Sequence, residues 1–61
     1  MDSSTLQIIK MLPNRLNVLV NEILEGRTVE GLQIPSNITA GEYLLLILLE
    51  RSIKANEGKG F

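Results

Sequence analysis

Two acidic side chains, Glu22 and Glu25, lie one helical turn apart in the sequence. Paired carboxylates can divide the general acid and general base roles of a hydrolytic reaction between them. Such chemistry also needs a pocket and usually a basic or nucleophilic neighbour, and the chain contains no His and no Cys. We therefore interpret the pair as a solvated helix end and predict that the protein is not an enzyme.

The remaining motifs also lack the residues that a cofactor or metal requires. Without Cys and His, the chain can form neither a disulfide nor a zinc site of the usual kind. Gly26 and Gly31 bracket a short segment that does not resemble a phosphate-binding loop. Asn37 to Thr39 match a glycosylation acceptor, but Thr39 is better explained as a helix cap. We expect no catalytic residue, metal or cofactor.

Charge and hydropathy limit the classes of partner. Six basic residues stand against seven acidic ones, and Lys10, Arg15 and Arg27 could form only a small basic edge, so the balance argues against nucleic acid. The longest apolar run, residues 43–49, is much shorter than the roughly 20 residues of a membrane-spanning helix. The first residues are acidic and polar, unlike a secretory signal. We expect a soluble, cytoplasmic protein without a membrane partner.

Apolar residues recur at alternating spacings of three and four between positions 4 and 25. This spacing is typical of a helix seam that packs against another helix. Ser4 with Gln7 resembles a capping box at the start, and Gly26 suits the position after the end. The pattern predicts a first helical segment over residues 4–25. Its seam consists of Ile9, Leu12, Leu16, Leu19 and Ile23.

Pro13 interrupts this first segment. Inside a helix, proline removes one backbone hydrogen bond and clashes with the carbonyl of Ile9, at a cost of about 3 kcal/mol. At the first position of a new helix it costs little. The segment is therefore either one kinked helix or two helices divided near Leu12. Because the seam keeps its phase across the proline, both halves are expected to face one core.

Residues 27–36 do not follow a helical pattern, and we expect a connector there. Ile34 precedes Pro35 and is therefore biased toward an extended conformation. One interpretation is an extended connector that places Leu32 and Ile34 onto the helices. The alternative is a short β arm with a turn near Gly31, although an isolated two-stranded hairpin is marginal in water.

The last helix is predicted over residues 40–57, with a frayed tail over 58–61. Thr39 and Glu42 have the spacing of a capping box, which marks the start. Glu50 and Lys54 form an i,i+4 pair in the more favourable orientation, which contributes a few tenths of a kcal/mol.

The apolar run at residues 43–49 covers nearly two turns, so its side chains point to all sides of the last helix. Leu46 and Leu49 continue the phase of Ile53, and we expect them to pack within the chain. The other sides exceed what one neighbouring segment can cover, and we expect another chain to bury them. Burial entirely within one chain is the alternative.

The predicted interface for self-association or for a partner combines both helical segments. On the polar side of the first segment, Asn17 and Asn21 either face solvent or fix the register of an oligomer seam. The predicted interface residues are Leu44, Leu45, Leu48, Leu16, Leu19 and Ile23.

A 61-residue chain buries only about 60% of its unfolded surface and is marginal as a monomer. Association with other chains is the common remedy when disulfides and metals are absent. We therefore predict one all-α domain, residues 1–61: a helical hairpin with a kinked or split first helix and an extended or short β connector, packed as an oligomeric helical bundle.

The predicted function is that of a small, non-enzymatic regulatory or adaptor protein that self-associates as a homodimer or larger oligomer and binds a larger protein. Small helical proteins of this kind often act as inhibitors, antirepressors or assembly factors, including phage-encoded ones. The link to these roles rests on what other proteins of this type do and not on a physical argument. Two alternatives stay open: a dimeric DNA-associated transcription regulator and a structural subunit of a larger assembly.

Overall fold

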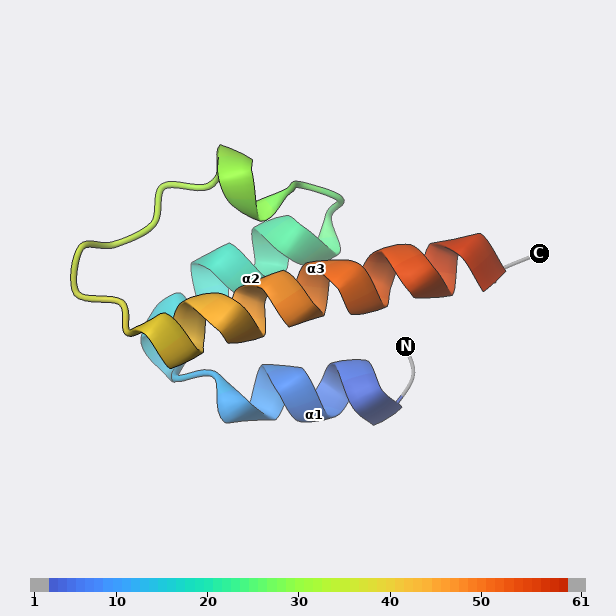
Figure 1. Ribbon diagram of the computed structural model, residues 1–61, viewed down its shortest axis with the longest axis horizontal. Helices are drawn as coiled ribbons and strands as arrows, with labels where there is room; N and C mark the ends of the chain where they lie inside the picture. Colours follow the sequence, from blue (N-terminus) through green and yellow to red (C-terminus); the bar gives the residue numbers. More distant parts are fainter. Residues whose placement is uncertain (1–2, 60–61) are drawn as a thin grey trace.

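The computed structural model describes the backbone of residues 3–59 and the side chains of residues 3–55. It contains three α-helices, and the connections between them include two 3₁₀ turns (Figure 1). No strand occurs within residues 3–59, so the all-α prediction is confirmed. The elements, in chain order, are α1 (Ser3–Met11), η1 (Asn14–Leu16), α2 (Asn17–Leu24), η2 (Val29–Gly31) and α3 (Ala40–Lys59).

Pro13 divides the first predicted segment into two helices. Its backbone is extended, with φ −69° and ψ 155°, so α1 ends before it. Its carbonyl then accepts a hydrogen bond of 3.0 Å from the Leu16 N–H, which begins the next helical turn. The split alternative therefore holds. α1 begins at Ser3, so Ser4 lies inside the first turn and not at the predicted cap position.

The course of the chain differs from the predicted hairpin. α1 runs antiparallel to α3 (Figure 1). Thr5 near the start of α1 therefore lies beside the second half of α3, where it hydrogen-bonds to Ser52. α2 runs parallel to α3, because Arg15 just before α2 pairs with Glu42 at the start of α3. The reversal lies at Pro13, and the long segment 25–39 returns the chain to the start of α3 (Figure 1). Residue spacing alone does not encode this direction.

Gly26 ends α2 as predicted. Its φ of 104° is left-handed, a conformation that costs glycine little. Its N–H donates to the carbonyl of Ile23, and the Arg27 N–H donates to that of Glu22, each at 3.0 Å. This pair of bonds is a Schellman motif, and it satisfies two carbonyls at the helix end.

The connector is extended and contains one 3₁₀ turn, so the prediction of a β arm paired within the chain is wrong. Two backbone hydrogen bonds form the turn: the Gly31 N–H donates to the carbonyl of Thr28, and the Leu32 N–H donates to the carbonyl of Val29. The Val29 N–H donates 2.8 Å to the Glu50 carboxylate on α3 and is thereby unavailable to a strand partner. Leu32 is buried and Ile34 packs against the core, as the extended interpretation predicts.

The start of α3 follows the predicted capping box. The Glu42 N–H donates 3.1 Å to the Thr39 hydroxyl, and the Thr39 N–H donates 3.0 Å to the Glu42 carboxylate. The end differs: α3 continues through Gly58 to Lys59, two residues beyond the predicted end at residue 57. A glycine near a helix end costs only about 1 kcal/mol, which does not stop the helix by itself. Residues 60 and 61 of the predicted tail lie outside the described part of the chain.

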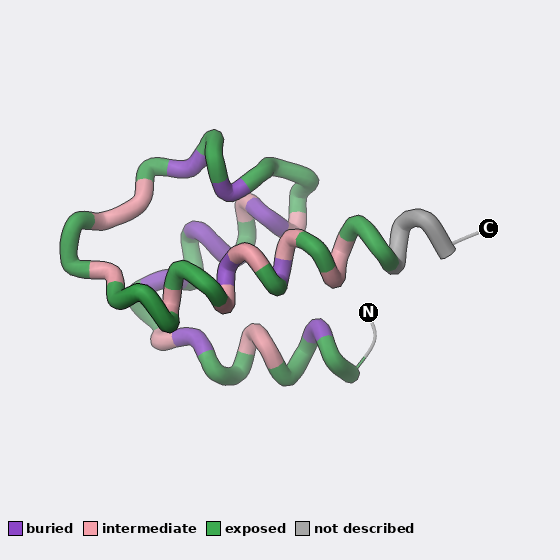
Figure 2. Tube along the Cα trace, in the orientation of Figure 1, coloured by how far each residue is buried: buried purple, intermediate pink, exposed green. Residues whose placement is uncertain are grey.

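The core lies where α1, α2 and the connector pack against α3 (Figure 2). Thr5 is the only buried polar residue among the described side chains, and it lies at the contact of α1 with α3. Both halves of the divided seam face this core, as expected from their phase. The buried apolar residues are Leu12, Leu16, Leu19, Val20, Ile23, Val29, Leu32, Leu46 and Leu49.

Candidate protein-binding surface

Three sides of α3 are covered within the chain. In Figure 1, α1 lies below α3, α2 lies behind it and the connector lies above it. Leu46 and Leu49 point to the covered side and are completely buried, which confirms that they pack within the chain. The fourth side of α3 points toward the viewer, and no described element covers it.

The fourth side of α3 carries an apolar stripe, which we call the outer stripe. It consists of Gly41, Leu44, Leu48, Arg51 and Ala55, all of them exposed. Their spacings of three, four, three and four place them on one helix face. Leu44 is 55% exposed and Leu48 is 40% exposed, so two large apolar side chains face solvent one turn apart.

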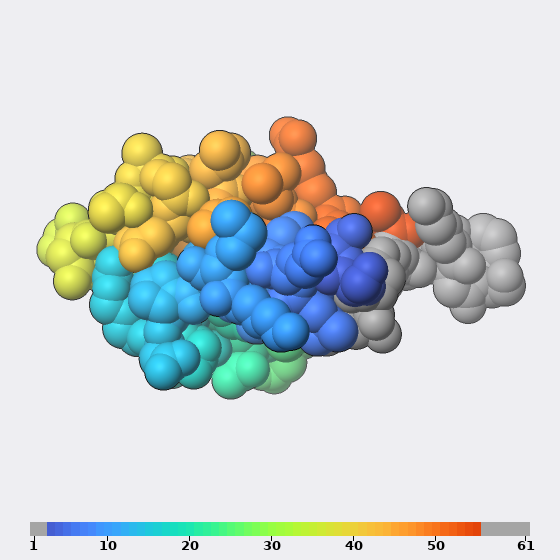
Figure 3. Space-filling model, turned by 90° about the horizontal axis from the view of Figure 1, so that it is seen from below, coloured from blue at the N-terminus to red at the C-terminus, as the bar shows by residue number. Residues whose placement is uncertain are grey.

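Met11 extends this apolar surface onto α1. Because α1 is antiparallel to α3, its last residue lies beside the first half of α3. Successive turns of α1 carry Ser4, Ile8 and Met11 on the side that borders the outer stripe. Met11 is 67% exposed, and Figure 3 shows α1 with α3 along one of its sides and α2 along the other.

The six predicted interface residues fall into two groups. Leu44 and Leu48 lie in the outer stripe, and Leu45 is half-buried at its edge, against the core. The other three belong to the core of the chain and present almost no surface to another chain, because they pack against α3. They are Leu16, Leu19 and Ile23. The candidate surface is therefore narrower than the predicted one and includes Met11, which spacing alone did not single out.

Ionic contacts hold the first half of the chain to the start of α3. Arg15 forms a salt bridge with Glu42 and a longer hydrogen bond of 3.4 Å with Asn37. The Thr39 N–H, which donates to this carboxylate, is the main reason that the pKa of Glu42 lies below its ordinary value, and Arg15 lowers it further. These contacts hold the end of the connector at the start of α3, beside the first residues of the outer stripe.

Glu50 fixes the other end of the connector. Its carboxylate accepts 2.8 Å bonds from the Lys54 ammonium and from the Val29 N–H. The Lys54 bond is the main reason that the pKa of Glu50 is lowered, and the Val29 bond also lowers it. The predicted Glu50–Lys54 pair is thereby confirmed. The bond to Val29 was not predictable, because the two residues are far apart in the sequence.

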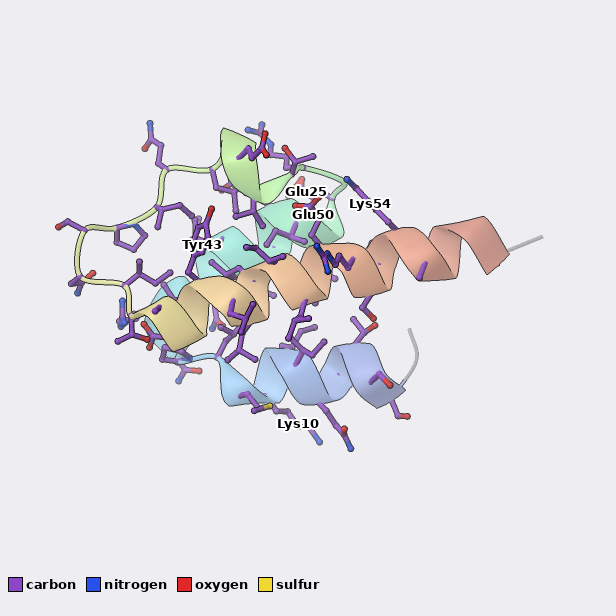
Figure 4. The ribbon with its side chains drawn as sticks, in the orientation of Figure 1. Lys10, Glu25, Tyr43, Glu50 and Lys54 are labelled. Atoms are coloured by element: carbon purple, nitrogen blue, oxygen red, sulfur yellow. The ribbon has the colours of Figure 1, made fainter. Side chains whose placement is uncertain are left out.

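An open cleft of about 420 Å³ lies between η2 and the upper side of α3. Figure 4 shows Tyr43, Glu50 and Lys54 along this side of α3, with Lys10 on the far side of α1. Two acidic and two basic side chains line the cleft (Glu30, Glu50, Arg51 and Lys54), so it favours no one ligand charge. Within the described residues, no group of His, Cys, Asp and Glu could hold a metal ion.

Comparisons with known proteins do not assign a family. No family model, no curated protein and no solved structure matches this chain. Among the described residues, no helix has the length and apolar character needed to cross a membrane. The functional inference therefore rests on the geometry of the surface.

Proposed function

We propose that this chain is a small regulatory or adaptor protein that acts by protein–protein contact, self-associating and docking on a larger protein through the outer stripe of α3. The observation that carries the proposal is the exposure of Leu44 and Leu48 on the one side of α3 that no described element covers. Met11, on the helix that flanks α3, adds a third exposed apolar side chain. Contiguous exposed apolar surface of this kind marks interaction sites.

Energetics support an intermolecular role for these residues. Full burial of a leucine side chain contributes roughly 1.5–3 kcal/mol, so covering the exposed halves of Leu44 and Leu48 contributes about 1 kcal/mol each. A domain of this size rarely has more than about 3–5 kcal/mol of stability from its own core. A partner on the outer stripe would therefore add substantially to the stability of the fold.

The DNA-associated alternative has less support. Three of the described basic side chains already pair with carboxylates: Arg15 with Glu42, Arg27 with Glu22 and Lys54 with Glu50. Neutralising many phosphates needs a group of unpaired basic residues on one face. The structural-subunit alternative needs a second, different surface. Away from the outer stripe, Leu6 on α1 and Val18 on α2 are also exposed, but singly exposed apolar residues are normal on a protein surface and do not define a second one.

The test compares two matched variants as immobilised baits for proteins of the native host, identified by mass spectrometry. Leu44→Glu places a charge in the outer stripe, and Val18→Glu places one at an exposed valine on α2. Circular dichroism first shows that both are folded. We expect Leu44→Glu to lose the proteins that the unmodified chain captures and Val18→Glu to retain them. Equal capture by both variants would contradict the proposed docking surface.

A further inference from the structure

We infer that the outer stripe binds a second copy of this chain, with the two α3 helices antiparallel about a two-fold axis beside Leu48. This inference rests on the proposed function, because it assigns an occupant to the same stripe. Two observations support it: the arrangement of small and large residues along the stripe, and the position of its only charge.

The two smallest residues of the stripe lie at equal distances from Leu48. Gly41 lies seven positions before Leu48, and Ala55 lies seven positions after it. In an antiparallel pair centred on Leu48, Gly41 of one chain faces Ala55 of the other. Nothing in the same chain lies within 4 Å of the position that a Gly41 side chain would occupy. Small residues at both ends let the helices approach closely, and the leucines fill the middle.

Arg51 decides between the two possible directions of the second helix. In a parallel pair, Arg51 of one chain would face Arg51 of the other and place two like charges in an apolar seam. In the antiparallel pair these charges are six residues apart, about 9 Å along the axis at 1.5 Å per residue. The aliphatic part of Arg51 then covers Leu44 of the second chain.

The flanks of the stripe are compatible with the antiparallel pair. Under the two-fold operation, the side that carries Tyr43 meets the same side of the second chain. Arg51 of one chain and Tyr43 of the other then lie two residues apart along the axis, about 3 Å at 1.5 Å per residue. Tyr43 is itself exposed. Met11 lies on the opposite flank, where it meets its own copy.

The length of the stripe sets the strength of the contact. Residues 41–55 span about 21 Å at 1.5 Å per residue. One helix face of four turns forms an interface at the small end of specific protein contacts. We therefore expect a weak dimer that separates on dilution.

Single cysteine variants test the arrangement in this cysteine-free chain. A disulfide needs Cα atoms about 4.4–6.8 Å apart, and only a residue beside the two-fold axis lies that close to its own copy in an antiparallel pair. Under mild oxidation, Leu48→Cys should cross-link to itself. Leu44→Cys and Ala55→Cys should each form no disulfide with their own copies, because these copies are about 12 Å and 21 Å apart along the axis. A mixture of Gly41→Cys with Ala55→Cys should give the mixed dimer.

Val18→Cys is the control, because its side chain is exposed on α2, away from the stripe. It should show only the background rate of disulfide formation. Self-cross-linking of Leu44→Cys and Ala55→Cys would show a parallel pair and overturn the antiparallel arrangement. If Leu48→Cys forms disulfides no faster than Val18→Cys, the second copy is not the occupant. The docking part of the proposed function still stands in that case if Leu44→Glu selectively loses host proteins in the capture experiment.

Discussion

Thr39 and Glu42 form a reciprocal pair of hydrogen bonds over three residues of sequence. A motif this short depends on local geometry alone, and the spacing of the two side chains was therefore sufficient to predict it. Thr5 and Ser52 also bond through their side chains, but 47 positions separate them. Nothing in the local pattern of either residue indicates the other. At the residue scale, the predictable contacts are those within one turn of helix.

The first prediction concerns the cap of α3. Thr39→Ala removes the hydroxyl that accepts from the Glu42 N–H, and we expect it to lower the free energy of unfolding by about 0.5–2 kcal/mol. Urea denaturation measures the change. Ser36→Ala is the control, because Ser36 is exposed and lies outside the capping box. Equal losses in the two variants would show that the hydroxyl of Thr39 does not stabilise the helix start.

The second prediction concerns pH. The folded-state pKa values of Glu42 and Glu50 are both lowered, so the folded state favours their ionised forms. Their stabilisation is present above the ordinary value of 4.5 and is lost as pH falls through the lowered folded-state values. We expect the free energy of unfolding of the unmodified chain to decrease below about pH 4.5.

Glu42→Gln and Glu50→Gln identify the groups responsible. Each variant should be less stable than the unmodified chain at pH 7, and each should lose less stability on acidification. Glu25→Gln is the control, because Glu25 is exposed and forms no ion pair with the side chains of residues 3–55. If all three variants lost stability on acidification as the unmodified chain does, the two connector contacts would not account for the acid sensitivity.

Pro13 and Gly26 mark two helix boundaries at the scale of elements, although the sequence left open whether Pro13 kinks or divides the first segment. Both residues act through their own backbone, by a missing N–H in one case and a positive φ in the other. The direction of α2 relative to α3 was not predictable, because it depends on the path of residues 25–39. That path is held by contacts such as Val29 with Glu50, which join distant segments. Boundaries are therefore local properties of the chain, whereas topology is not.

The third prediction concerns the end of α2. Gly26→Ala places a side chain on a residue with φ of 104°, and we expect a loss of about 1 kcal/mol or more in the free energy of unfolding. Gly31→Ala is the matched control in the same connector. Its new Cβ would lie 3.7 Å from the Thr28 hydroxyl, an ordinary contact. Thermal unfolding of both variants measures the difference, and a more stable Gly26→Ala variant would contradict the Schellman motif.

Leu44 and Leu48 connect the helix pattern to the behaviour of the whole molecule. The apolar run at residues 43–49 predicted more apolar side chains on the last helix than one chain can bury, and Leu44 and Leu48 remain exposed. The run itself did not show which sides were covered, because consecutive apolar residues remove the periodicity that would orient them. Leu16, Leu19 and Ile23 were assigned to the interface for the same reason: burial by the same chain and burial by another chain leave the same pattern in the sequence.

The most direct test of the outer stripe as a protein-binding surface is sedimentation equilibrium across a micromolar concentration series. The unmodified chain should shift toward twice its mass of 6.8 kDa as concentration rises. Leu48→Glu should remain folded, because the side chain is already 40% exposed, and should stay at 6.8 kDa, because pairing would bury an uncompensated charge. Val18→Glu should associate as the unmodified chain does. A folded, concentration-independent mass of 6.8 kDa for the unmodified chain, or undiminished association of Leu48→Glu, would contradict self-association through this surface.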